Sequence, residues 1–364
     1  MKKDRKKLIS PFAVLSVLLF IIIGAVYFAT DLSAAFAERV NSTVSRAFRI
    51  FMAGIGDIFP FSLIELVILC LPIILFFVIR KALRVFSSRE GRGRFIINIA
   101  ALLLLIYSGH LLALGIAHNT SPISEKMGLC ETEVTRENLS EMLTNLRDEI
   151  NLIAEDMPRD ESGLFDPGYS YDEISALVCD SYDALAEEYG LDRGFASRAK
   201  GVRFSFAMSY LGITGIYTYP TGEANVNTQY PAYVTLFTTA HEMSHQRGIL
   251  RENEANFVAY LITTASGDDC LRYSGLLNMY GYFSSALYKT DKEAYYAING
   301  ELSPLARTDI RAANAVTEKY GDTIIEDISE WINNLYLKSS GTPDGTVSYS
   351  RVVHLVLAYE NARK

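Results

Sequence analysis

The chain has 364 residues, of which 49% are hydrophobic, and its mean hydropathy is +0.14, so it is richer in apolar residues than an ordinary soluble protein. Its formal net charge is −8, and an acidic protein is repelled by phosphate backbones, which excludes nucleic acid as the expected partner. The four cysteines form no C-x-x-C pair and no Cys/His cluster, which excludes a zinc site built on thiolates.

Three long apolar runs in the first third of the chain predict transmembrane helices. The runs cover about residues 8–29, 61–79 and 95–117. Each reaches the roughly 20 residues that a helix needs to cross a bilayer core. Glu65 interrupts the second run, and a carboxylate there is expected to face an interface or a neighbouring helix rather than lipid. The sequence therefore predicts a membrane domain over residues 1–117, with the lipid bilayer as a partner.

The basic residues predict how the chain is oriented. Five lysines and arginines precede the first run, and six occupy the loop between the second and third runs, and such residues stay on the cytoplasmic side. Residues 1–94 hold 14 Lys and Arg against 6 Asp and Glu, which leaves 20 against 36 for residues 95–364. We therefore expect a multi-pass protein of the cytoplasmic membrane with a cytoplasmic N-terminus and an acidic extracytoplasmic domain over residues 118–364.

Two features between the first and second runs each have two interpretations. Ala35-Phe36-Ala37 is similar to a signal-peptidase site, but the apolar run before it is longer than the ~7–15 residues of a signal peptide, which favours an uncleaved anchor. Residues 31–59 carry apolar side chains at helical spacing, with arginines among them. This segment either lies along the outer membrane surface or packs against the extracytoplasmic domain.

Most of the extracytoplasmic part is predicted to be helical. Thr135 can cap one helix, and Ser170 with Glu173 forms the capping box of another, which ends near Gly190. Proline, glycine and aspartate between these helices predict a loop over residues 158–169. Further helices are expected over residues 269–287, 292–298, 304–320, 324–337 and 350–362. Three of the cysteines lie in this part, which permits one disulfide.

The pattern changes in the middle of this domain, from Val202 to Thr221. Aromatic and β-branched residues alternate there with several glycines. Such a pattern predicts short strands or an extended hairpin, with Phe204 and Phe206 among the strand residues.

The next stretch, His241-Glu242-Met243-Ser244-His245, has the spacing of a metal site. On a helix, positions four apart share a face, so His241 and His245 can offer two imidazole nitrogens to one cation while Glu242 projects beside them. This is the H-E-x-x-H arrangement of zinc peptidases, in which the glutamate acts as the general base. The alternative is an exposed helix face that carries these residues by accident.

A catalytic zinc ion needs three protein ligands and one open position. Gly248 can end the first helix in a left-handed conformation. A second helix that starts near Arg251 would then return Glu252 and Glu254 towards the histidines. We expect Glu252 to be the third ligand, with Glu254 as the alternative and a solvated helix face as the other role for either carboxylate. Asn256, one turn after Glu252, would hold a zinc-bound histidine in place.

Residues 241–260, together with residues 221–227, resemble an uncharacterised bacterial family of membrane proteins known only as a domain of unknown function, and the resemblance covers nearly the whole chain. More distantly, Glu252-Asn253-Glu254-Ala255-Asn256 is similar to the E-x-x-A-D/N signature of gluzincin peptidases, among them membrane-bound CAAX-type proteases and ImmA-like peptidases. This similarity implies that Glu252 binds zinc and that Asn256 supports a histidine.

The resemblance to gluzincins has a departure. The gap between His245 and Glu252 is seven positions, which is shorter than in typical gluzincins. His245-Gln246-Arg247-Gly248 is also similar to the H-x-x-G of metzincins, which would place a third histidine where this chain has Arg251. The third ligand and the exact clan of peptidases therefore stay open at this point.

The extended segment before the first histidine has an expected role of its own. In zinc peptidases the strand before the catalytic helix forms one wall of the cleft, where an extended peptide pairs with its backbone. Residues 215–227 occupy that position, so we expect Glu223, Asn225 and Asn227 to line the substrate cleft. The alternative is a tight loop in which these side chains satisfy local backbone groups.

The expected fold is thus mainly α, with three N-terminal transmembrane helices followed by a zincin-like α+β domain that has a small β-hairpin or sheet before the catalytic helix. The expected function is a membrane-anchored zinc metallopeptidase that hydrolyses protein or peptide substrates outside the cytoplasmic membrane. Zn²⁺ would activate water, and Glu242 would pass its proton to the leaving amine. Tyr219, Tyr349 and His354 are the candidates for stabilising the oxyanion.

Two other functions are the alternatives. One is a zinc-stabilised, non-catalytic binding or scaffold protein of the envelope, and the other is a membrane structural protein without metal. An intramembrane protease is disfavoured because polar residues, rather than a 20-residue apolar run, flank the histidines.

Overall fold

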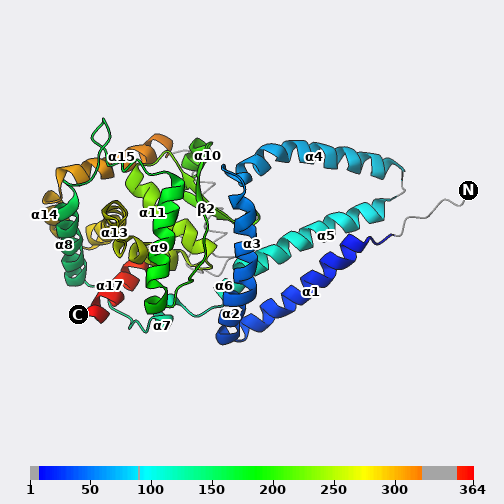
Figure 1. Cartoon of the computed structure of the whole chain (residues 1–364), viewed down its shortest axis with the longest axis horizontal. Coiled ribbons are helices and arrows are strands. Elements are labelled where there is room, and N and C mark those ends of the chain that lie inside the picture. The colour runs from blue at the N-terminus through cyan, green and yellow to red at the C-terminus, as the bar shows by residue number, and fades with distance from the viewer. Residues whose placement is uncertain (1–7, 89–90, 322–350) are drawn as a thin grey trace, which may run out of the picture.

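Three long apolar helices project from one side of a helical domain in the computed structural model of the chain, which describes residues 8–88, 91–321 and 351–364 (Figure 1). They are α1 (Pro11–Asp31), α4 (Leu63–Ser88) and α5 (Arg92–His110), and the last continues as η2 (Leu111–Gly115) and α6 (Ile116–His118). All three are long and apolar enough to cross a membrane, as the sequence predicts. α1 and α5 lie side by side, whereas α4 runs apart from them (Figure 1).

A helical segment lies between these spans and the domain. It consists of α2 (Ala34–Val40), η1 (Asn41–Ser45) and α3 (Arg46–Asp57). α3 packs closely on the domain, because a Cβ on Gly222 would lie 2.3 Å from the backbone of Met52 and Ala53. Of the two arrangements expected for residues 31–59, this segment therefore shows packing against the domain.

The rest of the chain forms a helical domain around one core. Its helices are α7 (Ile123–Lys126), α8 (Arg136–Ile153), α9 (Tyr171–Tyr189), α10 (Ser205–Tyr210), α11 (Ala232–Gln246), α12 (Glu252–Thr264), α13 (Asp269–Thr290), α14 (Lys292–Gly300), α15 (Pro304–Tyr320) and α17 (Arg351–Arg363). α11, α12 and α13 pack against one another at the centre, and α8, α9 and α17 cover them. Fully buried aromatic rings such as Phe257, Tyr273 and Phe283 fill the space between them, and their burial is the main source of stability.

Local signals in the sequence account for several helix ends. Thr135 and Ser170 form the capping boxes of α8 and α9, and Gly190 ends α9 with φ +64°. A helix expected over residues 324–337 lies outside the described residues. All four cysteines are free, so the permitted disulfide is not formed.

A small three-stranded sheet lies beside α11. Its strands are β1 (Ala199–Val202), β2 (Gly215–Thr218) and β3 (Glu223–Asn227), in the order β1-β3-β2. β3 pairs in parallel with β1 and antiparallel with β2, so β2 and β3 form the expected hairpin. The expected strand at Phe204 and Phe206 is wrong. The N–H groups of Arg203 and Phe204 donate to the Glu65 carboxylate of α4, and α10 begins at Ser205, so this tertiary contact overrides the β preference of the aromatic residues.

A buried ion pair fastens this sheet to the start of α4. Lys200 Nζ lies 2.6 Å from Glu223 Oε1, and the two side chains are 6% and 1% exposed. Glu223 also accepts hydrogen bonds from the backbone N–H groups of Leu63 and Ile64, the first residues of α4. The positive end of the helix dipole favours a carboxylate there. The ion pair therefore determines where α4 leaves the domain.

Candidate metal centre

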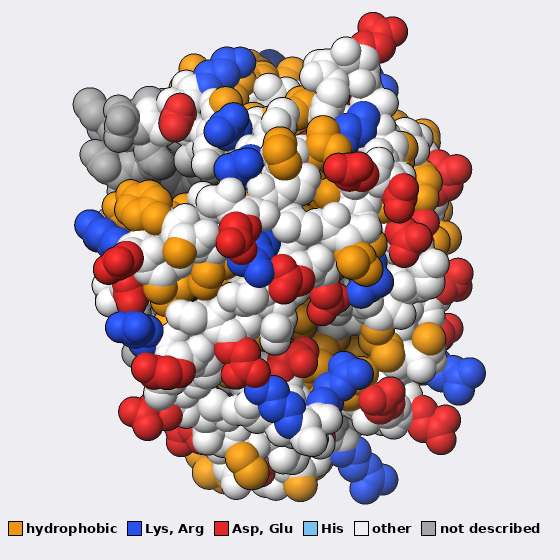
Figure 2. All heavy atoms as spheres, turned by 90° about the vertical axis from the view of Figure 1, so that its left-hand side faces the viewer, with side chains coloured by type: hydrophobic (Ala, Val, Ile, Leu, Met, Phe, Trp, Pro, Cys, Tyr) orange, Lys and Arg blue, Asp and Glu red, His pale blue; other side chains and the backbone are white. Residues whose placement is uncertain are grey.

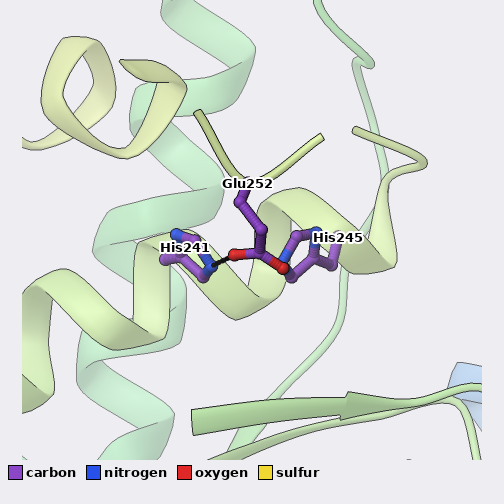
Figure 3. Close-up of side chains that lie close together, drawn as sticks. All are labelled: His241, His245 and Glu252. Atoms are coloured by element: carbon purple, nitrogen blue, oxygen red, sulfur yellow. Dashed lines mark ion pairs between the residues drawn. The ribbon is translucent and has the colours of Figure 1, made fainter. Parts of the chain in front are cut away.

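Two successive helices bring His241, His245 and Glu252 to one point, which we call the His–His–Glu site. His241 and His245 lie one turn apart on α11, and Glu252 is the first residue of α12. The Glu252 carboxylate reaches between the two imidazoles (Figure 3). Its Oε2 lies 3.3 Å from His241 Nε2, and its Oε1 lies 3.5 Å from His245 Nε2.

The turn between α11 and α12 is a Schellman motif. The Gly248 N–H donates to the His245 carbonyl at 2.9 Å, and the Ile249 N–H donates to the Ser244 carbonyl at 3.1 Å. Gly248 has φ +91°, in the left-handed region that favours glycine, as the sequence predicts. The turn also places the Ile249 carbonyl 2.8 Å from His245 Nδ1. His245 is thereby held with its Nε2 towards Glu252.

The three residues form a loose cluster of possible metal ligands. Each imidazole lies near a different oxygen of Glu252, at 3.3 and 3.5 Å. One ligand atom from each residue lies within 4.8 Å of the other two, a looser spacing than the roughly 3.4 Å between ligands that are each about 2.1 Å from a tetrahedral zinc ion. A histidine held through its second nitrogen by a backbone carbonyl is the usual support for such a ligand. The side chains of His241 and Glu252 are 13% and 17% exposed, so solvent reaches the site. These residues can hold a metal ion with a further position for water.

Burial and mutual attraction act in opposite directions on the charges at this site. Burial is the largest single influence on His245 and disfavours its charged form, but the attraction and hydrogen bond of Glu252, together with Glu242 and the Ile249 carbonyl, outweigh it and raise the pKa of His245 to about 9. Burial likewise opposes ionisation of Glu252, but both histidines hold its pKa far below the usual value. Glu252 is therefore anionic at neutral pH, as a carboxylate ligand must be.

Glu242 lies beside the two histidines on the side of α11 that faces the sheet. Its side chain is buried, and burial raises its pKa against the attraction of His241 and His245. Its Oε2 has no hydrogen-bond partner in the described part of the chain. β2 passes so close that a Cβ on Gly215 would lie 2.6 Å from Glu242 Oε1. A buried carboxylate with a raised pKa and a free oxygen has the properties of a general base.

Glu254, the alternative third ligand, points away from the histidines. Its Oε1 accepts a hydrogen bond from the Ile123 N–H at 3.0 Å and lies 3.2 Å from Arg251 Nη1. The structure thus brings Glu252, and not Glu254, to the two imidazoles. Asn256 is buried, but its Nδ2 has no partner and no hydrogen bond joins it to either histidine within the described ranges. Its support of a zinc-bound histidine therefore stays a prediction.

The expectation that Glu223, Asn225 and Asn227 line a cleft is wrong for their side chains. All three are at most 1% exposed, and their hydrogen bonds are internal. Glu223 belongs to the ion pair at the start of α4, Asn225 Oδ1 accepts from the Ser62 hydroxyl at 2.7 Å, and Asn227 Nδ2 donates to the Ile213 carbonyl at 2.8 Å. β3 is the central strand, so both of its edges are paired, and β2 is the edge strand next to α11.

Arg49 of α3 packs against the Gly248 turn beside the His–His–Glu site, and sequence reasoning missed it. It is 1% exposed, and its Nη1 donates to Asn41 Oδ1 at 2.9 Å. Its guanidinium lies against the turn, because a Cβ on Gly248 would be 2.6 Å from Nη2. In the sequence Arg49 is one of several arginines in an amphipathic segment, and nothing local distinguishes the one that is buried.

Arg251 connects the start of α12 to the end of the third span. Its Nη2 donates to the carbonyls of His118 at 2.9 Å and Thr120 at 2.8 Å. Arg251 directly precedes Glu252, so the His–His–Glu site is linked through one residue to the end of the third span. Of the oxyanion candidates, Tyr219 donates to the Ile106 carbonyl in α5, His354 is exposed on α17, and Tyr349 lies outside the described residues.

Comparison with known proteins places the chain in a family. No curated protein and no solved structure matches it. A family model described as a protein of unknown function (DUF3810) matches residues 36–357, a stretch that holds two of the three spans, the sheet and the His–His–Glu site. Since the match covers most of the sequence, the chain belongs to the DUF3810 family.

Proposed function

We propose that this protein is a membrane-anchored zinc metallopeptidase. The observation that carries the proposal is the convergence of His241, His245 and Glu252, whose ligand atoms lie within 4.8 Å of one another, with the buried Glu242 beside them. Three protein ligands and a neighbouring base are the minimum that metal-assisted hydrolysis requires.

The proposal includes an orientation. The loop between α4 and α5 is rich in basic residues, which favours the cytoplasmic side. With that loop in the cytoplasm, the domain after α5 would lie outside the cytoplasmic membrane. The acidic balance of residues 95–364 agrees with this placement, because positive charge is retained on the cytoplasmic side.

Each residue of the site has a defined part in the proposed reaction. A bound zinc ion would supply a Lewis acid that acidifies water and polarises the scissile carbonyl. His241 and His245 would hold the ion through Nε2, and Glu252 would hold it through its carboxylate. Glu242 would take up a proton from water at Oε2 and deliver it to the leaving amine, and its raised pKa suits it to hold that proton between the two steps. The backbone of β2 offers its edge to an extended substrate.

A zinc-stabilised scaffold is the second candidate, and the environment of Glu242 argues against it. A purely structural zinc site is closed by four protein ligands and needs no base. Among the described residues the site has three ligands, and Glu242 keeps an oxygen without a partner inside the protein. An unpartnered buried carboxylate lowers the stability of the fold, and a purely structural zinc site would gain nothing from it.

The proposal is tested by metal content and cleavage together. The zinc content of the purified full-length protein is measured for wild type, His241→Ala and Glu242→Gln, and each is incubated with a peptide library. We expect His241→Ala to lose zinc, and Glu242→Gln to keep zinc but lose cleavage. Glu187→Gln, at an exposed position of α9, is the control and should change neither. Zinc without cleavage in the wild type would favour the scaffold, and a wild type without zinc would overturn both candidates.

A further inference from the structure

Phe204 and Phe206 form an exposed apolar pair on the surface of the domain. Their side chains are 47% and 50% exposed, and their ring centroids lie 6.3 Å apart. Ser205 between them is buried, so the chain turns both rings outwards. Arg203 precedes them and is also exposed. Two exposed aromatic rings beside a cation are typical of a surface that lies at a membrane interface.

The backbone of this pair is bound to the first turn of the second span. Glu65 Oε1 accepts from the Phe204 N–H at 2.8 Å, and its Oε2 accepts from the Arg203 N–H at 3.1 Å. Glu65 is the third residue of the apolar helix Leu63–Ser87. Phe204 therefore lies within about one helical turn, roughly 5 Å, of the level at which α4 enters the apolar layer. This contact also explains the carboxylate in the span, because Glu65 binds backbone groups at the interface.

A second contact joins the domain to another span. The Tyr219 hydroxyl donates to the Ile106 carbonyl of α5 at 3.3 Å, and its ring packs against His110 with centroids 5.6 Å apart. Tyr107, in the same turn, is 51% exposed. Aromatic residues with a polar tip gather at membrane–water interfaces. Two contacts with separate spans hold this face of the domain towards the bilayer.

The opposite face of the domain differs. Figure 2 shows the side farthest from the three spans, and acidic and basic side chains are scattered over it with small apolar groups between them. The apolar pair is instead held through Glu65 at the start of α4, where Leu66 is 42% exposed, and Phe61 just before this helix is 38% exposed. This position favours lipid as the occupant, because α4 is long and apolar enough to cross a membrane.

We propose that Arg203, Phe204 and Phe206 form a lipid-contact surface. The two rings enter the interfacial layer of the bilayer, and the Arg203 guanidinium faces lipid phosphates. The surface holds the domain against the membrane in addition to the spans themselves. The occupant is the headgroup region of the bilayer in which the protein is anchored, and not a second protein.

If the proposed function holds, the contact of the domain with the bilayer also indicates a substrate class. Residues 111 and 113–117 of the third span are buried inside the protein, and the His118 carbonyl accepts a hydrogen bond from Arg251 beside the His–His–Glu site. His118 lies eight helical positions after His110, which corresponds to about 12 Å. An extended peptide covers that distance with about four residues. The substrate would then be a membrane-anchored polypeptide cleaved a few residues from the bilayer surface.

The lipid contact is tested with tryptophan at the apolar pair. Trp331 is the single tryptophan of the chain, so Trp331→Phe gives a silent background. Phe204→Trp and Phe206→Trp are introduced into it, and the full-length protein is placed in nanodiscs that contain lipids brominated near the headgroup. The matched controls are Leu152→Trp and Tyr296→Trp, at positions that are 82% and 61% exposed.

We expect bromolipid to quench the emission at positions 204 and 206 at least twofold and to leave both controls unchanged. Emission at both positions that matches the controls would overturn the proposal. If a tryptophan variant fails to fold, an environment-sensitive dye on Ala207→Cys, at an exposed position of the same turn, gives the same readout. Labelling then uses a background in which the four native cysteines are replaced.

The substrate class needs a separate measurement. One cleavable sequence is presented either as a soluble peptide or about four to eight residues from a transmembrane anchor in the same nanodisc. We expect kcat/KM to be at least tenfold higher for the anchored form, and Phe204→Ser/Phe206→Ser to reduce that advantage. Equal cleavage of both forms would overturn the substrate class and leave the peptidase standing. Cleavage of neither form, with quenching at 204 and 206, would overturn the proposed function and leave the lipid contact standing.

Discussion

Two of the regions that bury carboxylates differ in how the negative charge is compensated. At the start of α4, Glu223 is paired with Lys200 and accepts two backbone N–H groups. Every strong interaction of that carboxylate is made inside the protein. Such an ion pair has a structural role, because the buried charge is fully compensated.

At the His–His–Glu site, by contrast, several buried polar atoms have no hydrogen-bond partner in the described part of the chain. His241 Nδ1, Glu242 Oε2 and Asn256 Nδ2 are buried without hydrogen-bond partners among the described residues. An unpaired buried polar atom costs about 1–3 kcal/mol. Under the proposed function these polar groups stay available for metal and substrate. Charge compensation, and not burial alone, thus distinguishes Glu223 from Glu242.

Removing Glu223 should have the largest effect on stability. Glu223→Ala leaves Lys200 buried without a counter-charge, so we expect the free energy of unfolding to fall by about 3–5 kcal/mol. Denaturant unfolding of the detergent-solubilised protein measures this change. Replacing both partners, as Glu223→Leu with Lys200→Met, should recover most of the loss, since no unpaired charge remains. If Glu223→Ala is as stable as the wild type, the ion pair does not stabilise the fold.

Neutralising Glu242 should affect catalysis and not folding. Glu242→Gln removes the base, so we expect kcat to fall about 10²–10⁴-fold. The free energy of unfolding should stay equal or rise, because burial already disfavours the charged form of Glu242. Cleavage assays and denaturant unfolding of the same preparation test the two halves of this prediction. A large loss of stability would place Glu242 with Glu223 among the structural carboxylates.

The pH dependence of stability should distinguish the metal-free site from the zinc-loaded one. The pKa of His245 is raised to about 9, above the ~6.5 of an unfolded histidine. Its contribution to stability is therefore complete below pH 6.5 and is lost as the pH rises through 9. Between pH 6.5 and 8 the loss is about 2 kcal/mol at most.

Zinc should reverse this trend, because the metal binds neutral imidazole and gains affinity as protons leave. Thermal unfolding from pH 6.5 to 9, with chelator and with zinc, measures both cases. Glu252→Gln should flatten the metal-free profile, since it removes the main partner of His245. A metal-free wild type whose stability rises over this range would contradict the assigned pairing.

The Gly248 turn allows the smallest and most specific test. Gly248→Ala places a Cβ at φ +91° and against Arg49, so we expect a loss of about 1–3 kcal/mol and weaker zinc binding. Gly190→Ala is the matched control, because Gly190 also has positive φ but nothing lies within 4 Å of its Cβ position. It should cost about 1 kcal/mol and leave zinc affinity unchanged. Equal effects on zinc affinity would mean that the turn does not position the ligands.

The sequence by itself determined the features that depend on short stretches of chain. Apolar runs defined the three spans, capping boxes defined the starts of α8 and α9, and four-residue spacing placed His241 and His245 on one face. Gly248 was recognisable for the same reason, because a left-handed turn is a local preference. These features follow from periodicity and backbone sterics within a few residues.

Tertiary structure decided which side chain meets which partner. Glu252 and Glu254 are two residues apart on one helix, and only the direction of α12 gives one to the histidines and the other to Arg251. Asn225 and Asn227 are buried and make internal hydrogen bonds because β3 is the central strand. Phe204 left the predicted strand for the same kind of reason: its backbone is held by Glu65, 139 positions earlier. Contacts of this kind join segments that are distant in the chain, so no local pattern in the sequence records them.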